Sequence, residues 1–135
     1  MAKVLIDPVI TINSVDLSGS IASVTLNTSV ADVTTTNFGS NGAVTRVGGL
    51  KDSSVSIEFH NDWDAAGVSA TISALVGSTT TVAVKPDSDA TSATNPEYSM
   101  TVLVTEWPYI DGAVGDLASA SVTWPVSGVI TESTS

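Results

Sequence analysis

The residues of this chain that could do chemistry are few, and the first is its single histidine, His60. It stands at a polar position in a stretch where polar and apolar residues alternate. A Ser-His-Asp set is possible from the composition, but no G-x-S-x-G sequence is present to expose a nucleophilic serine. Cysteine is absent, which excludes a thiolate nucleophile and a cysteine-bound metal. We therefore expect no catalytic residue, and His60 is predicted to lie on the surface or in an interface.

A second candidate is an acidic turn that resembles the start of a calcium-binding loop. Asp62, Asp64 and Gly67 have the spacing of such a loop, but Ala66 replaces a ligand and Ser73 replaces the bidentate glutamate. Aspartates that precede an apolar pattern with helical spacing commonly cap the helix. We therefore expect Asp62 or Asp64 to be a helix N-cap, and we expect no metal and no other cofactor.

The third candidate is the set of tryptophans, Trp63, Trp107 and Trp124. Exposed tryptophans can form a carbohydrate-binding surface, because their rings combine a large apolar area with a polar N–H group. Their positions, one at a helix start and two at strand ends before a proline, favour core or interface anchors instead. Both interpretations remain open from the sequence.

The composition limits the partners. The 135 residues suffice for one domain with a sizeable core. Only 13% are charged, the formal net charge is -10, and 20 Ser and 18 Thr supply most of the polarity. So acidic a chain has no cluster of basic residues that could bind the phosphates of a nucleic acid, and its negative charge is repelled by anionic membranes. The N-terminal apolar run is too short for a signal peptide or a membrane span. So few charges on an apolar chain predict that other copies cover part of its surface.

The elements that must hold these residues are mostly strands. Residues 54–60 alternate with period two, and apolar residues at 68, 72, 75 and 76 recur with helical spacing before Gly77. Residues 79–84 are β-branched and end before Pro86, so a short helix is expected between two strands. The same patterns predict further strands over residues 9–12, 20–30, 98–105, 119–125 and 126–131.

One long segment, residues 31–47, lacks core residues. The turn residues Ser40-Asn41-Gly42 are typical of a hairpin tip, so this segment is predicted to form an extended two-stranded arm. Its aromatic residue Phe38 and its cation Arg46 suit docking on another surface better than exposure to solvent.

The order of several motifs resembles the major tail proteins, or tail tube proteins, of long-tailed non-contractile bacteriophages. The similarity extends from about residue 9 to residue 128. It includes a D-x-T element at Asp32, the GLKD turn at residues 49–52, the strand that ends at Phe59 and the final VTWPVSG segment.

The resemblance implies a mainly β fold, a β-sandwich or barrel of two packed antiparallel sheets with one short flanking helix. It implies a single tail-tube domain over residues 1–135, with the arm at about 31–47. Copies would form rings, hexameric by analogy, that stack into a tube around the tape-measure protein and later the DNA. Candidate contacts between subunits are Asp32, Phe38, Arg46, Leu50, Lys51, Asp52, Trp107 and Trp124.

The resemblance also implies a structural virion protein rather than an enzyme. Such a protein is located in the tail of the virion and is made in the cytoplasm of the host bacterium. Its partners would be itself, the tape-measure protein, other tail proteins, and viral DNA that passes without specific binding; no membrane is involved. The sequence does not identify the carboxylates that would face the channel. The alternative function is a host-attachment β-sandwich that binds carbohydrate.

Overall fold

The computed structural model describes residues 4–63 and 67–134 of the chain. In chain order, its elements are β1 (Val9–Ile12), β2 (Val15–Asp16), β3 (Ile21–Thr34), β4 (Arg46–His60), α1 (Val68–Ser73), β5 (Thr79–Lys85), β6 (Glu97–Leu103), β7 (Ser119–Pro125) and β8 (Thr131–Ser133). The mainly β class with one short helix, predicted from the sequence, is confirmed for these residues.

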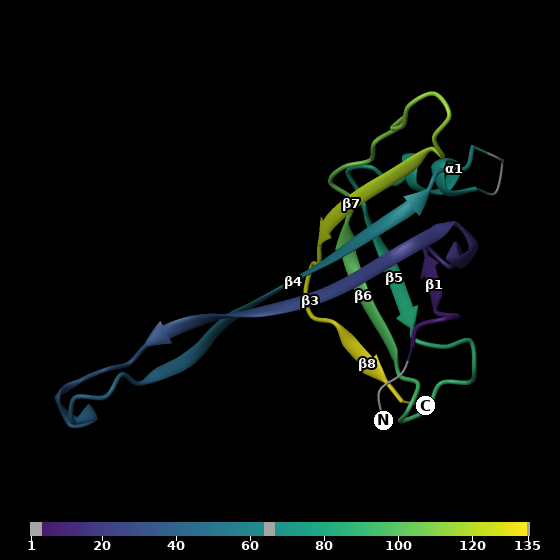
Figure 1. Cartoon of the computed structure of the whole chain (residues 1–135). Helices are drawn as coiled ribbons and strands as arrows, with labels where there is room; N and C mark the ends of the chain where they lie inside the picture. Colours follow the sequence, from purple (N-terminus) through teal and green to yellow (C-terminus); the bar gives the residue numbers. More distant parts are fainter. Residues whose placement is uncertain (1–3, 64–66, 135) are drawn as a thin grey trace.

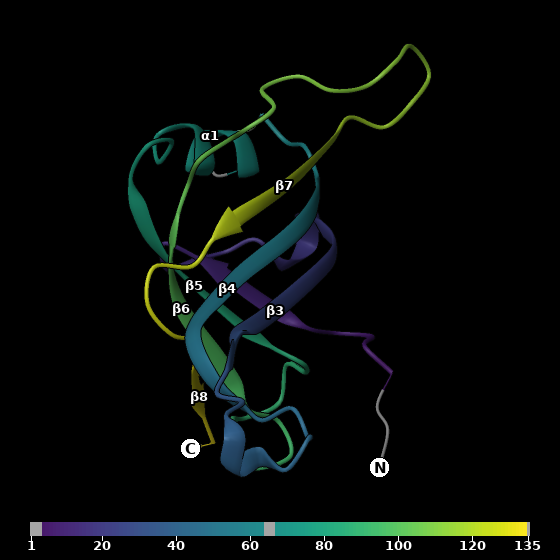
Figure 2. The ribbon, with the colours of Figure 1, turned by 90° about the vertical axis from the view of Figure 1, so that its left-hand side faces the viewer.

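The strands form two antiparallel sheets that pack as a sandwich rather than a closed barrel (Figures 1 and 2). One sheet has five strands in the order β2-β1-β5-β6-β8, and the other has three in the order β3-β4-β7. The helix α1 lies at one end of the sandwich in both views. Each sheet ends in two edge strands, which in the smaller sheet are β3 and β7. The outer side of β7 is partly covered by its own chain, because the Ser119 amide donates to the Asp111 carbonyl and the Thr123 amide donates to Glu106 Oε1.

The core lies between the sheets because apolar residues alternate with polar ones along the central strands. On β4, Val55, Ile57 and Phe59 are buried while Glu58 and His60 are exposed. The strand β7 presents Ala120, Val122 and Trp124 to the same core, as its period-two pattern predicts. The other buried apolar side chains come chiefly from β1, β5, β6 and α1: Ile10, Ile12, Val68, Ile72, Val82, Val84, Met100 and Val102.

The helix differs from the predicted one in length and in its cap. It covers Val68–Ser73, and its N-cap is Gly67 rather than Asp62; Asp64 lies outside the described residues. The main-chain carbonyl of Asp62 accepts a hydrogen bond from the Ser69 amide, and Gly67 lies so close to Asp62 that a Cβ atom would be 2.7 Å from its carbonyl oxygen. Close packing at this turn thus selects glycine as the cap. The chain turns before Gly77, whose φ of 86° is the left-handed conformation expected there.

The last predicted strand is misplaced. Residues 126–131 were expected to be extended, but the strand β8 begins only at Thr131. Val126 forms a single bridge to Val102 and then the chain bends, with Gly128 at a φ of 104°. The bend carries the chain from the smaller sheet to β6 of the larger one.

Candidate functional site

The most prominent exposed feature is a two-stranded arm formed by the outer halves of β3 and β4 (Figure 1). The strands pair from Ile21↔Phe59 at the body to Thr34↔Arg46 near the tip. Apart from half-buried Ser40, every residue from 27 to 52 is exposed, so the arm contacts little of its own subunit. The predicted arm at residues 31–47 is therefore present, and it extends further toward the body on both strands.

The tip is an ordered turn. The Asn37 side chain accepts a hydrogen bond from the Gly39 amide, and the Ser40 hydroxyl accepts one from the Asn37 amide. Asn41 and Gly42 take the left-handed conformation, with φ values of 54° and 82°. Such a capping box fixes the tip without tertiary contacts. Phe38 is held in this turn with its side chain fully exposed.

The predicted contact residues Asp32 and Arg46 face each other across the arm. The Arg46 Nε atom lies 2.9 Å from a carboxylate oxygen of Asp32, and both side chains are more than half exposed. A pair this exposed contributes little to folding. It neutralises the arm locally, because Asp32, Asp52, Arg46 and Lys51 are the only charged residues from 27 to 52 and their charges sum to zero.

The other predicted contact residues on β4 lie where the arm joins the body. Leu50 is exposed over 86% of its surface, and Lys51 and Asp52 are also exposed. Lys51 is paired in register with Val30, and the Ser29 hydroxyl donates to the Asp52 carbonyl at 3.3 Å. An apolar side chain as exposed as Leu50 favours contact with another molecule.

The tryptophan predictions need correction. Trp124 is fully buried and Trp107 is 6% exposed, so neither is available to contact another subunit from the surface. Both rings pack on Phe59, at centroid distances of 6.2 and 5.4 Å, and Trp124 Nε1 donates to the Glu106 carbonyl. Trp124 lies on the inward side of β7, and the chain beyond β6 turns Trp107 into the same core. Only Trp63 is exposed, so the tryptophans form no shared carbohydrate-binding surface.

The outer side of the smaller sheet is a surface of hydroxyl groups. We call it the hydroxyl face, formed by Ser23, Thr25, Ser56, Ser121, Thr123 and the acids Glu58 and Glu106 around a shallow hollow of about 250 Å³. Ser56 and Thr123 hydroxyls are hydrogen bonded across the strands at 3.1 Å. No basic residue from the described part of the chain lines the hollow. The sequence pattern predicted polar residues here but not that three strands would combine them.

A second exposed apolar feature was not predicted from the sequence. The loop of residues 108–118 projects from the end of the body opposite the arm tip (Figures 1 and 2). It exposes Tyr109, Ile110, Val114 and Leu117. Two glycines and two aspartates lie among these apolar residues, so no local pattern marks the loop as an apolar surface.

The residues considered for catalysis or metal binding are not assembled into a site. His60 is exposed at the end of β4, where it is paired in register with Ser119. Within residues 4–63 and 67–134, no group of three or more His, Cys, Asp or Glu residues could hold a metal ion. In the same residues, no helix is long and apolar enough to cross a membrane.

Comparison with known proteins gives a fold relationship. No family model and no curated protein matches the sequence. The structure is similar to a chain of a solved structure described as the tail of an empty GTA particle computed with helical refinement and C6 symmetry. The TM-score is 0.60 with 12% sequence identity, and the match covers 83% of this chain and 81% of that one. The chain therefore shares its fold with a protein of that tail.

Proposed function

We propose that this protein is a structural subunit of a tail tube, in which copies form hexameric rings that stack into a conduit for DNA ejection. The observation that carries the proposal is the fold shared with a chain of a C6-symmetric tail over most of both chains. The exposed arm supports it, because an ordered tip that holds Phe38 fully exposed and without tertiary contacts is a poor surface for a solitary subunit.

The two different edges of the smaller sheet support ring formation. A closed ring requires a heterologous interface, in which two different surfaces of each subunit meet head to tail. The edges β3 and β7 are two such surfaces. A free edge also invites uncontrolled pairing unless it is covered. The outer side of β7 is partly covered by Asp111 and Glu106 of the same chain, so in the proposed ring a neighbouring copy would chiefly cover β3.

We propose that the hydroxyl face lines the channel. Serine and threonine hydroxyls hydrate well, and the described residues that line the hollow include the acids Glu58 and Glu106 but no cation that would bind phosphate. DNA could then move past the wall without specific binding. The other partners in this proposal are the tape-measure protein and further tail proteins, and the location is the tail of a virion assembled in the host cytoplasm. The role is structural rather than enzymatic.

Negative-stain electron microscopy of the purified chain tests the proposal. We expect rings or hollow tubes, formed spontaneously at high protein concentration or after addition of tail initiation complexes. A monodisperse monomer under both conditions would contradict the proposal. Glycan binding by such a monomer would support the host-attachment alternative instead.

A further inference from the structure

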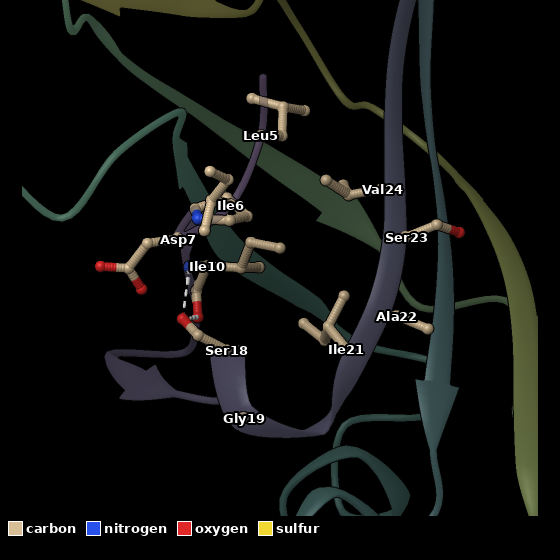
Figure 3. Close-up of a pocket in the computed structure, with 11 residues that line it drawn as sticks. Leu5, Ile6, Asp7, Ile10, Ser18, Gly19, Ile21, Ala22, Ser23 and Val24 are labelled. Atoms are coloured by element: carbon tan, nitrogen blue, oxygen red, sulfur yellow. Dashed lines mark hydrogen bonds between the residues drawn. The ribbon is translucent and has the colours of Figure 1, made fainter. Parts of the chain in front are cut away.

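A groove lies between β1, the segment before it, and the start of β3 (Figure 3). We call it the β1–β3 groove; it has a volume of about 440 Å³. Buried Ile10 lies on one side, and the half-buried side chains of Ile21 and Val24 point toward it from β3. Leu5 and Ile6 form the remaining apolar wall, and they are 60% and 85% exposed.

The groove is open because of an irregularity in β3. The pairing of β3 with β4 shifts between Ile21 and Ser23, which leaves Ala22 as an extra residue. Ile21 and Val24 therefore point to the same side although they are three residues apart. The strand β3 is an edge, so this wall also carries main-chain groups that have no strand partner. The groove thus offers both apolar contact and hydrogen-bonding groups.

Two exposed apolar segments of this chain have a tip that could enter the groove. One is the arm tip with Phe38, and the other is the loop 108–118 with Val114; both side chains are fully exposed. Their charges differ. Residues 33–45 of the arm contain no charged residue, whereas the loop contains Asp111 and Asp116.

The charge of the groove favours the arm tip. Among residues 4–63 and 67–134, the only charged residue that lines the groove is Asp7, and the whole chain has a net charge of -10. Bringing the acidic loop to this acidic surface would cost repulsion, while the uncharged tip would not.

The tip must come from a second copy of the chain. The arm leads away from the groove of its own subunit (Figure 1). From residue 27 to Phe38 the extended chain spans roughly 36 Å, so the tip lies far from its own body and within reach of a neighbouring one. The ordered turn at the tip lowers the entropy lost when Phe38 docks.

We infer that the arm tip of one copy docks into the β1–β3 groove of another, with Phe38 between the N-terminal segment and β3. This inference rests on the proposed tube assembly and identifies the surface that receives the arm.

Disulfide trapping tests this contact, and the chain contains no cysteine to interfere. Full-length chains carrying Ala43→Cys at the arm tip are mixed with chains carrying Ile6→Cys in the groove, assembled and mildly oxidised. Gly19→Cys is a second groove variant, because a Cβ atom there meets no neighbour within 4 Å. The matched control is Val114→Cys on the loop, which is mixed with the groove variants in place of the Ala43→Cys chain. We expect linked pairs with the groove variants and none with the control.

Phe38→Ala in the Ala43→Cys chain separates docking from chance collision. Burial of an aromatic side chain contributes enough binding free energy that its loss should weaken docking, and hence trapping, by about tenfold or more. If tubes form but trapping occurs with Val114→Cys, or with no groove variant, the groove assignment is wrong while the proposed function stands. If neither rings nor tubes form, both are wrong.

Discussion

At the scale of single residues, the fold depends on a compact aromatic group around Phe59. Trp124 packs on its ring from β7, and Trp107 packs on it from the segment after β6. Trp124 also donates a hydrogen bond to the Glu106 carbonyl. This contact ties the segment after β6 to β7. Trp124 is therefore a core residue whose loss would affect stability first and assembly only as a consequence.

Replacement of Trp124 by alanine should lower the free energy of unfolding by about 3–5 kcal/mol, because it leaves a large cavity at a fully buried site. Trp63→Ala is the control, since this side chain is 55% exposed and should change stability by less than about 0.5 kcal/mol. Urea denaturation of each purified variant measures the difference. Equal effects of the two substitutions would contradict the core assignment of Trp124.

Asp16 gives a residue-scale prediction about pH. Hydrogen bonds from the Ser18 hydroxyl and from the Ser18 amide lower the pKa of this carboxyl. A lowered pKa means that folding favours the carboxylate, so the stabilisation is present above the unfolded pKa, about 4, and is lost as the pH falls through the folded value. Thermal unfolding should show wild type more stable than Asp16→Asn at pH 6, with a smaller difference at about pH 2.5. A difference independent of pH would contradict this account.

At the scale of elements, alternation in the sequence predicted most strands well. The bounds of β7, the inward side of β4 and the hairpin with its tip at Ser40-Asn41-Gly42 follow from local patterns and turn residues. These features are local, because period two and turn geometry are properties of a few neighbouring residues.

Features that depend on tertiary contacts were not predictable in this way. The helix cap is Gly67 because of close packing against Asp62, and β8 begins late because the chain first crosses between sheets. The sequence left Trp107 between the core and an interface, and only the tertiary structure shows that it lies in the core. The β1–β3 groove joins segments that belong to different sheets, and no local pattern marks such a juxtaposition.

The arm gives the element-scale prediction. Replacing residues 31–50 by Asn-Gly should leave a folded subunit, because the removed residues make little contact with the body and the two-residue turn keeps Val30 opposite Lys51. Circular dichroism and the unfolding midpoint should change little, while tube formation is lost. Unchanged tube formation in electron micrographs would show that the arm is dispensable for stacking.

At the scale of the whole molecule, the arm and the rest of the chain differ in net charge. The arm is neutral, whereas the rest of the chain carries the full net charge of -10. A neutral contact element allows acidic subunits to associate, and an acidic, hydroxyl-rich wall does not retain a polyanion.

A lysine in the hydroxyl face should therefore impede DNA. In a particle whose tail contains this protein, Glu58→Lys should leave tubes intact but reduce genome delivery about tenfold or more, because repeated cations along a channel bind phosphates. Glu132→Lys is the matched control: it makes the same charge change at an exposed position on β8, in the other sheet. Equal delivery by the two variants would contradict the assignment of the hydroxyl face to the channel.

The central claim is that copies of this chain assemble into a tube through the arm. A cryo-electron microscopy reconstruction of assembled protein tests it most directly. The account predicts rings of six subunits, the hydroxyl face toward a central channel, and each arm tip against the body of another copy. A reconstruction in which the arm tips project free into solvent, or a protein that remains monomeric under all assembly conditions, would contradict it.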